Sequence, residues 1–444
     1  MNIPKGFQRY LTNTAWLFIE RVVRLGIAFV VSIYVARYLG PQQFGMLSYA
    51  ISFVSIFTVL ANLGLQPILV RELVNCKDKS NELLGSAFVL KLSGTLSMLI
   101  LFAVLVPIIS ESTLETFLIF IVAASVVFQS FNVIDFYYQA EVRSKYSVQV
   151  RVIALLFSSA MKLVLIILHA SLLYFAVVLA VESVVTAAGF VSIYHYQHKS
   201  IFHWKYCWSS AKALLKDSWP LIISGIAISV YLKIDQVMIK NMIDASAVGC
   251  YAVAVRISES LYFISLIVVN SLFPAIINAK KKNSRLYHKR LQQLYDGLVW
   301  LGIDLSIILS ISAEWIITLL YGDKFPGAGQ VLRIHVWALV FVYMGQASSR
   351  WFLAENKQLQ LTVIHALGSI INVGLNLFVI PKYGIQGAAW TTVFSYACSS
   401  YLNVLIFPDC RITFKMLSSS LNPVGALRRY YVHYINLNKR LKGE

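Results

Sequence analysis

The chain has 444 residues, of which 58% are hydrophobic and only 13% are charged, and its formal net charge is +18. Soluble domains average about 45–50% apolar and about 25% charged residues, so this composition excludes a disordered chain, a collagen-like fibre and an ordinary soluble enzyme. A basic excess is often typical of nucleic-acid binding. Here the basic residues lie between apolar runs of membrane-spanning length, which favours a membrane surface and predicts an integral membrane protein.

Apolar runs of about 20 residues, enough helix to cross a ~30 Å hydrocarbon core, recur along the whole chain. The first run contains Glu20, Arg21 and Arg24 and lacks a small-x-small cleavage site, so we interpret it as a retained helix and not a signal peptide. Twelve transmembrane helices are predicted, over residues 13–36, 43–67, 87–109, 115–138, 150–169, 172–195, 218–241, 248–274, 295–319, 331–353, 359–380 and 385–407.

The connections between these spans alternate between short ones and longer, basic ones. Of the 38 Lys and Arg residues, we assign 27 to one side of the membrane, four to the other side and seven to the spans themselves. The side richer in Lys and Arg is cytoplasmic by the positive-inside rule. Both termini are therefore predicted to be cytoplasmic, and most of the net charge serves topology.

The longest interruption between spans follows the sixth one and suggests two halves. Residues 198–217 are basic, aromatic and amphipathic, which is typical of a linker helix lying in the cytoplasmic interface. We predict an N-terminal six-helix bundle over residues 1–197 and a C-terminal one over residues 218–407. The ends of the fourth and tenth spans resemble each other weakly, which favours a parallel repeat of the kind found in alternating-access transporters.

The remaining residues, 408–444, form a basic cytoplasmic tail in this interpretation. A solvated tail satisfies the positive-inside rule, and contact with anionic lipid or with a cytoplasmic partner is the alternative.

Several signals of enzymatic chemistry are missing from the sequence. No G-x-x-x-x-G-K-[ST] phosphate loop occurs, which excludes ATP hydrolysis by that route, and no extramembrane segment is long enough for a glycosyltransferase domain. Asp135 and Glu141 at the inner end of the fourth span are only a weak enzyme signal. The five cysteines are odd in number and form no C-x-x-C pair, so we interpret them as apolar filler. We predict no enzyme, no cofactor and no metal.

Ionisable side chains inside the spans are the candidate site, because each costs about 2.5–3.5 kcal/mol at bilayer depth and must face protein or water. In the first span Glu20, Arg21 and Arg24 share one helix face. Glu20 and Arg24 are four residues apart and suit a local ion pair, which would leave Arg21 unpaired. Lys162 in the fifth span and Glu182 in the sixth have no oppositely charged neighbour one turn away.

The seventh and eighth spans add further charges. Lys233 and Asp235 lie at depth on nearly opposite faces of the seventh. Lys240 is near the outer end, and we interpret it as a side chain that extends to the interface. Arg256 and Glu259 share one face of the eighth span, where a local ion pair and a binding role are alternatives.

Cationic side chains spread over four spans predict a water-filled cavity for a bulky anionic solute, whose phosphate oxygens they would bind by charge-assisted hydrogen bonds. The predicted substrate-binding residues are Arg21, Arg24, Lys162, Lys233 and Arg256. The predicted ion-coupling residues are Glu20 and Asp235, which would take up and release H⁺ or bind Na⁺.

Four short segments resemble polysaccharide flippases, the bacterial O-antigen and capsule exporters. Val35–Gly45 resembles their turn between the first and second helices, and Tyr231–Tyr251 resembles the turn between the seventh and eighth. Phe136–Lys145 and Leu353–Lys357 resemble the ends of their fourth and tenth helices. The resemblance covers residues ~10–405 and implies the multidrug/oligosaccharidyl-lipid/polysaccharide exporter fold, two six-helix bundles in a V around a central cavity.

The resemblance also implies a function. Such proteins move undecaprenyl-pyrophosphate-linked oligosaccharides from the cytoplasmic to the periplasmic leaflet of the bacterial inner membrane, and their cavities are typically cationic. Expected partners are this lipid-linked glycan, membrane lipids and the polysaccharide polymerase machinery, with no nucleic acid. Only Arg37, Asp235 and Gly249 match positions of the family's motifs.

Two other functions were weighed against a flippase. A cation-coupled multidrug exporter of the same fold would favour an acidic cavity, which the excess of Arg and Lys in these spans argues against. A membrane-embedded polysaccharide polymerase or ligase is expected to need a large periplasmic loop with catalytic groups, and the sequence has none.

Overall fold

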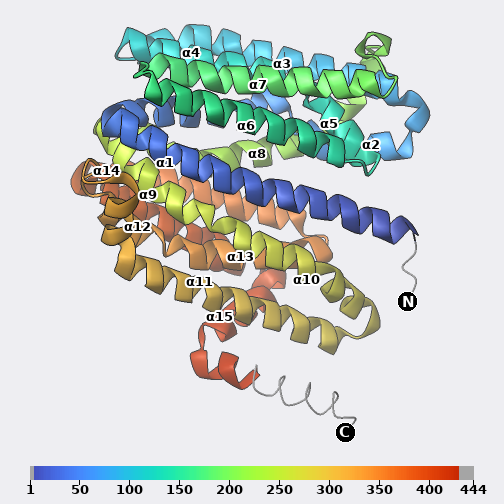
Figure 1. The fold of residues 1–444 in the computed structure, drawn as a ribbon. Coiled ribbons are helices and arrows are strands. Elements are labelled where there is room, and N and C mark those ends of the chain that lie inside the picture. Colours follow the sequence, from blue (N-terminus) through green and yellow to red (C-terminus); the bar gives the residue numbers. More distant parts are fainter. Residues whose placement is uncertain (1–4, 430–444) are drawn as a thin grey trace. The chain divides into compact units, whose positions relative to one another are not determined.

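The chain is a multi-pass, all-helical membrane protein (Figure 1). The computed structural model describes the backbone of residues 5–429 and the side chains of most residues from Trp16 onward, and this part contains no β-strand. Ten helical stretches in it are long and apolar enough to cross a membrane. The predicted all-α membrane architecture is confirmed.

Two of the ten stretches are too long for one crossing. Helix α1 (Lys5–Asn62) has 58 residues, about 87 Å of helix against a ~30 Å hydrocarbon core. It bends at Gly40, whose φ of 70° and ψ of 176° are nearly exclusive to glycine. Helix α14 (Gln358–Ala397) bends in the same way at Gly384, with φ 60°. Both glycines lie in predicted turns. The described residues contain ten candidate spans against the twelve predicted, and the two counts differ where α1 and α14 each continue as one helical stretch through such a bend.

The helices pack into two compact units, Met1–Lys240 and Asn241–Glu444. In the first, α6 and α7 lie side by side, as do α4 and α7, and α1 packs on α6. Its helices after α1 are α2 (Leu65–Asn75), α3 (Ser80–Ile109), α4 (Thr113–Phe128), α5 (Val133–Ala140), α6 (Lys145–Ile167), α7 (Leu172–Tyr196) and all but the last two residues of α8 (Trp208–Met242).

The second unit is built around α11 and α13, with α10 against both. Leu291, Leu294, Tyr295 and Tyr343 are among the fully or almost fully buried side chains of its core. Its helices are α9 (Ala245–Ser260), α10 (Tyr262–Lys282), α11 (Ser284–Tyr321), α12 (Ala328–His335), α13 (Ala338–Ala354), α14 and α15 (Arg411–Leu421).

The linker predicted over residues 198–217 does not form a separate interfacial helix. It contains a 3₁₀ turn, Ile201–His203, and an extended stretch, and α8 begins within it at Trp208. The extended stretch packs on α3, where the Lys205 amide donates to the Asn81 carbonyl at 3.2 Å. The first compact unit ends at Lys240, inside α8, and the second begins at Asn241. The bundle boundaries at residues 197 and 218 stay a prediction.

Gly85 on α3 lets this stretch approach closely. A Cβ atom on Gly85 would lie 2.6 Å from the Lys205 carbonyl oxygen. Backbone atoms cannot easily move away from such a contact. We therefore expect Gly85→Ala to lower the free energy of unfolding by about 1–3 kcal/mol, the usual cost of overpacking. Thermal unfolding of the purified protein measures this. Gly374→Ala is the matched control, because a Cβ atom on Gly374 meets nothing within 4 Å; an equal loss in both variants would contradict the explanation.

The predicted solvated tail is folded over its first part. Residues 408–429 pack on α11, and Cys410, Thr413 and Leu417 are completely buried. The remainder, residues 430–444, lies outside the described residues.

Candidate functional site

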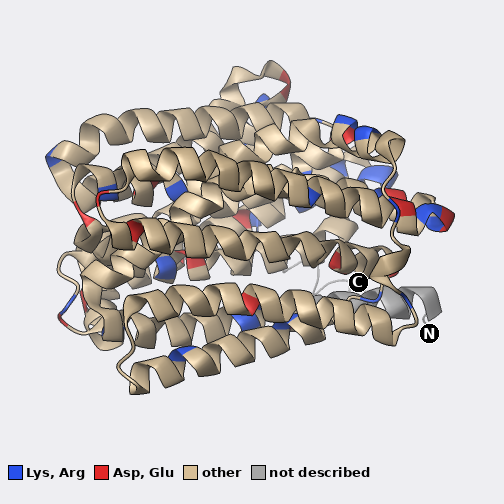
Figure 2. Cartoon of the chain, turned by 90° about the horizontal axis from the view of Figure 1, so that it is seen from above, with Lys and Arg blue, Asp and Glu red and all other residues tan. Residues whose placement is uncertain are grey.

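A polar cavity of about 440 Å³ lies inside the first unit, within the ~300–1,000 Å³ typical of small-molecule sites. It is bounded by α1, α4, α6, α7 and the 3₁₀ turn Gln129–Asn132. Figure 2 shows charged residues part-way along several helices as well as at helix ends. The polar side chains on the cavity wall are Arg24, Ser55, Thr58, Ser125, Gln129, Asn132, Arg151, Glu182, Ser183 and Thr186.

The fourth predicted span, residues 115–138, is interrupted where it borders the cavity. Helix α4 ends at Phe128, the 3₁₀ turn Gln129–Asn132 follows, and α5 continues to Ala140. A 3₁₀ stretch within a helical span often marks a functional position. Here it brings the Gln129 and Asn132 amides to the wall, where they add hydrogen-bond donors and acceptors at membrane depth.

Arg24 reaches the cavity from α1 and forms the expected local ion pair. Its Nε lies 3.0 Å from Oε1 of Glu20, one turn earlier. The Glu20 side chain is 4% exposed and that of Arg24 is 44% exposed. The carboxylate is therefore buried behind the guanidinium, which keeps part of its donor surface open.

Arg151 on α6 is arranged in the same way. Its Nη2 lies 2.5 Å from Oδ2 of Asp135 on α5, and Gln139 Nε2 donates to the same oxygen at 2.8 Å. The Asp135 side chain is 1% exposed against 29% for Arg151. The other carboxylate oxygen of Asp135 has no hydrogen-bond partner among the described residues. Arg151 is thus the ion-pair partner of Asp135, and the buried Lys91 on α3 adds a second positive charge in its surroundings. A buried carboxylate that loses such a partner is costly.

In a third ion pair the carboxylate, and not the cation, lines the cavity. Lys162 Nζ on α6 lies 3.4 Å from Oε2 of Glu182 on α7, and here the carboxylate lines the wall. The charged residues among the described lining residues are thus two arginines and one glutamate.

The structure places some of the predicted site residues at the cavity and others away from it. Arg24 lines the cavity, and Glu20 and Lys162 each pair with a residue that lines it. Arg21 is exposed on α1 and does not belong to the described lining of the cavity. Three further predicted residues lie elsewhere: Lys233, half-buried on α8, Asp235, buried on α8, and Arg256, half-buried on α9 of the second unit.

The interpretation of Lys240 as a side chain extending to the interface is wrong. Its side chain is only 5% exposed, and Nζ lies 2.9 Å from Glu111 and 3.0 Å from Glu115. It also lies over the Tyr49 ring, 5.5 Å from the centroid. Glu115 lies in the first turn of α4 and Glu111 in the connection just before it, and together they neutralise Lys240 within the protein.

Sequence reasoning missed Arg151 and undervalued Asp135. The sequence pattern places Arg151 among the basic cytoplasmic connections and makes Asp135 only a weak enzyme signal. One signal was available, because Asp135 lies eight residues before Arg143 in the connection and Arg151 lies eight residues after it. Residues at equal distances from a tight turn face each other in an antiparallel helical hairpin.

Comparison with known proteins identifies the family. Residues 10–280, more than half of the chain, match the family described as "Polysaccharide biosynthesis protein". The chain belongs to this family. Residues 220–378 also match the MatE family.

Relatives and solved structures agree with this membership. The chain is 23% identical over 397 residues to the "Probable low-salt glycan biosynthesis flippase Agl15" of Haloferax volcanii, which covers 87% of the chain and 81% of the relative. The "Probable flippase AglR" of the same organism is 24% identical over 240 residues, 52% of the chain and 45% of the relative.

The solved structures show the fold of this family member. The lipid II flippase MurJ in an inward closed conformation superposes with a TM-score of 0.71 at 16% identity, over 98% of this chain and all of that one. An inward-facing multidrug resistance MATE transporter gives a TM-score of 0.65 at 14% identity, over 91% and 99%. The predicted MATE-like fold is confirmed.

Proposed function

We propose that the protein is a flippase that moves an undecaprenyl-pyrophosphate-linked oligosaccharide, an O-antigen or capsule repeat unit, across the bacterial inner membrane. Transport runs from the cytoplasmic to the periplasmic leaflet by alternating access, with both termini cytoplasmic. The observation that carries this proposal is the cavity with two arginines and seven uncharged hydrogen-bonding side chains at membrane depth. Family membership and relatives named as flippases support it.

The arginines suit the phosphates of such a substrate. A guanidinium presents several donors in a rigid fork and binds phosphate oxygens in pairs. The hydroxyl and amide groups on the same wall, among them Thr58, Gln129 and Asn132, suit sugar hydroxyls. We therefore place Arg24 and Arg151 first among the phosphate-binding residues. Arg21, Lys162, Lys233 and Arg256 keep the substrate-binding role proposed for them.

Coupling to an ion follows from the same arrangement. When Glu20 is ionised it holds Arg24 in the ion pair, and when Glu20 takes up a proton it releases the guanidinium for the substrate. Proton uptake and anion binding then favour each other, as linkage requires. Asp235 is proposed as a second coupling group, with H⁺ or Na⁺ as the ion. No other cofactor is proposed, and the polymerase machinery is the proposed protein partner.

This coupling predicts the behaviour of Glu20→Gln. Binding of a short-chain prenyl pyrophosphate should be tighter in Glu20→Gln than in the wild-type protein at one fixed pH, because the neutral amide does not hold Arg24 in the ion pair. Binding titrations measure this, and Glu72→Gln on α2 is the control. Equal affinity in Glu20→Gln and in the wild-type protein would reject the coupling role.

A cation-coupled multidrug exporter is the second candidate, favoured by the MatE match and the MATE-like fold. The charges of the three ion pairs at the cavity balance, but Glu20 and Asp135 are buried while their partners Arg24 and Arg151 are partly exposed and line the wall. The wall therefore presents two guanidinium groups and one carboxylate, and this excess of exposed cationic donors favours an anion over a cationic drug. We propose a transporter and not a polymerase or ligase, in keeping with the relatives.

Complementation decides between these functions. The gene is expressed in a panel of bacteria that each lack their own O-antigen flippase, and surface polysaccharide is assayed beside membrane insertion. We expect repeat-unit polysaccharide to return in strains whose sugar is accepted. Stable insertion without polysaccharide in any strain, together with increased resistance to cationic drugs, would overturn the proposal.

A further inference from the structure

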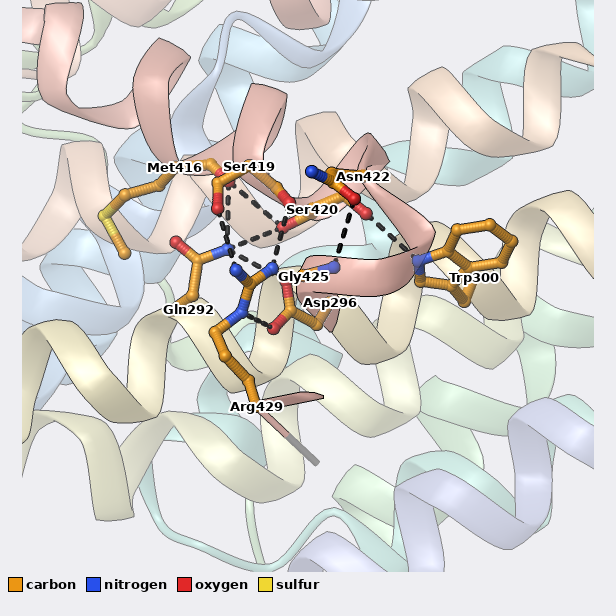
Figure 3. Close-up of polar contacts among 9 residues, drawn as sticks. All are labelled: Gln292, Asp296, Trp300, Met416, Ser419, Ser420, Asn422, Gly425 and Arg429. Carbon is orange, nitrogen blue, oxygen red and sulfur yellow. Dashed lines mark hydrogen bonds and ion pairs between the residues drawn. The ribbon is translucent and has the colours of Figure 1, made fainter. Parts of the chain in front are cut away.

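The end of the described chain is fastened to α11 by a compact polar network (Figure 3). Arg429 binds Asp296 through two hydrogen bonds, Nε to Oδ2 at 2.7 Å and Nη2 to Oδ1 at 2.8 Å. The Asp296 side chain is only 1% exposed, so this ion pair is well shielded from water. Gln292 donates to Ser420 Oγ at 2.8 Å, and Trp300 Nε1 donates to the Ser420 carbonyl at 3.0 Å. Residues 408–429 are therefore held in one place and are not a free tail.

The residues of α11 that hold the C-terminal segment lie where this helix changes from polar to apolar composition. Its first thirteen residues, 284–296, are rich in charged and amide side chains, whereas the predicted span 295–319 is mainly apolar. Gln292 and Asp296 lie before or at this transition, and Trp300 lies one turn beyond it. Tryptophan with a hydrogen-bonded N–H is typical of the level between headgroups and hydrocarbon. Both observations favour a position of α15 near the level of the membrane surface.

The outer surface of the docked segment combines exposed apolar and basic side chains. Val424 is 74% exposed and Leu427 is 70% exposed, and they are three residues apart on one face of the last helical turns. Ile412 and Leu421 are exposed to a smaller extent. The exposed basic residues of the segment are Arg411, Lys415 and Arg428.

We propose that residues 408–429 form a surface anchor that binds the anionic phospholipid headgroups of the membrane in which the protein lies. Val424 and Leu427 enter the interface between headgroups and acyl chains, and Arg411, Lys415 and Arg428 bind lipid phosphates. Apolar and basic residues side by side are the chemistry of an interfacial helix on an anionic leaflet. The negative surface charge of an anionic leaflet complements the three cations. A neutral leaflet has no such charge.

The anchor is tested with the full chain in lipid nanodiscs, by spin labels at Val424→Cys and Leu427→Cys. Cys76 and Cys207 are replaced by serine in this background, and the three other cysteines are buried. Nanodiscs contain phosphatidylcholine alone or a mixture with phosphatidylglycerol. Accessibility to oxygen reports lipid, and accessibility to a soluble nickel chelate reports water. A label at Lys281→Cys, exposed at the polar end of α10, is the matched control.

We expect both labels to gain oxygen access and lose nickel access when phosphatidylglycerol is present, while the control label stays accessible to nickel. The variant Arg411→Gln/Lys415→Gln/Arg428→Gln should lose this lipid dependence, with an unchanged thermal unfolding temperature as evidence of folding. Labels that stay in water in both lipids would overturn the proposal. Immersion that is equal in both lipids and in the triple variant, or protection only after cytosolic extract is added, would overturn it as well. Transport is not a readout, so the result is independent of the proposed function.

Discussion

Replacing Arg24 by alanine is expected to abolish most transport and also to lower stability, because the buried Glu20 carboxylate loses its ion-pair partner. In Glu20→Gln/Arg24→Ala, which removes both charges, stability should largely return while transport stays low. Arg24 is the predicted substrate-binding residue that lines the cavity, and its side chain is 44% exposed. Hydrogen bonds to charged groups contribute about 1.5–3 kcal/mol each, so the loss of one such bond corresponds to about a 10- to 150-fold weaker affinity for the phosphate group. Binding of a prenyl pyrophosphate and translocation of lipid-linked glycan in proteoliposomes measure the effect.

Two variants make the Arg24 result specific. Arg24→Lys keeps the charge and loses the fork, so it should retain more transport than Arg24→Ala if positive potential matters more than paired hydrogen bonds. Lys212→Ala removes an exposed positive charge on α8 outside the cavity lining and should leave transport unchanged. Full transport by Arg24→Ala would contradict the assignment of this cavity as the substrate site.

Removing Arg151 is expected to damage both stability and transport. Asp135 would stay buried with its main partner gone, and breaking a buried ion pair from one side typically costs about 3–5 kcal/mol. Transport should fall as well, because Arg151 supplies the second guanidinium of the cavity. Thermal unfolding in detergent and the translocation assay measure the two effects for Arg151→Met.

A double-mutant cycle separates these two effects. Asp135→Asn/Arg151→Met removes both charges, so much of the lost stability should return, since the uncompensated carboxylate is gone. Transport should stay low in the double variant, because the phosphate still lacks its guanidinium. If transport returned together with stability, Arg151 would have a structural role alone, and its place among the binding residues would be wrong.

The sequence predicted best those features that depend on local geometry. The ion pair between Glu20 and Arg24 follows from a spacing of four residues on one helix, and the structure contains it. The bend at Gly40 follows from a glycine and proline between two apolar runs. The pair between Lys162 and Glu182 was not predicted, because its members are 20 residues apart on two helices.

The Lys240 error has the same origin. A lysine near the end of an apolar helix is usually free to reach water, and only the neighbouring helix decides otherwise. The carboxylates of Glu111 and Glu115 come from a segment more than 120 residues earlier in the chain. The docking of Arg429 on Asp296, 133 residues away, was beyond sequence reasoning for the same reason.

The sequence by itself thus determined that the chain is a multi-pass helical membrane protein, because hydrocarbon requires every spanning segment to satisfy its own backbone hydrogen bonds. It also indicated that the charged side chains within the spans must face protein or water, because their exposure to hydrocarbon is costly. Which of these charges meet, which line a cavity and which neutralise one another was decided by tertiary structure alone. Ion pairs act over a few ångströms, and only the packing of helices distant in sequence brings such groups within that range.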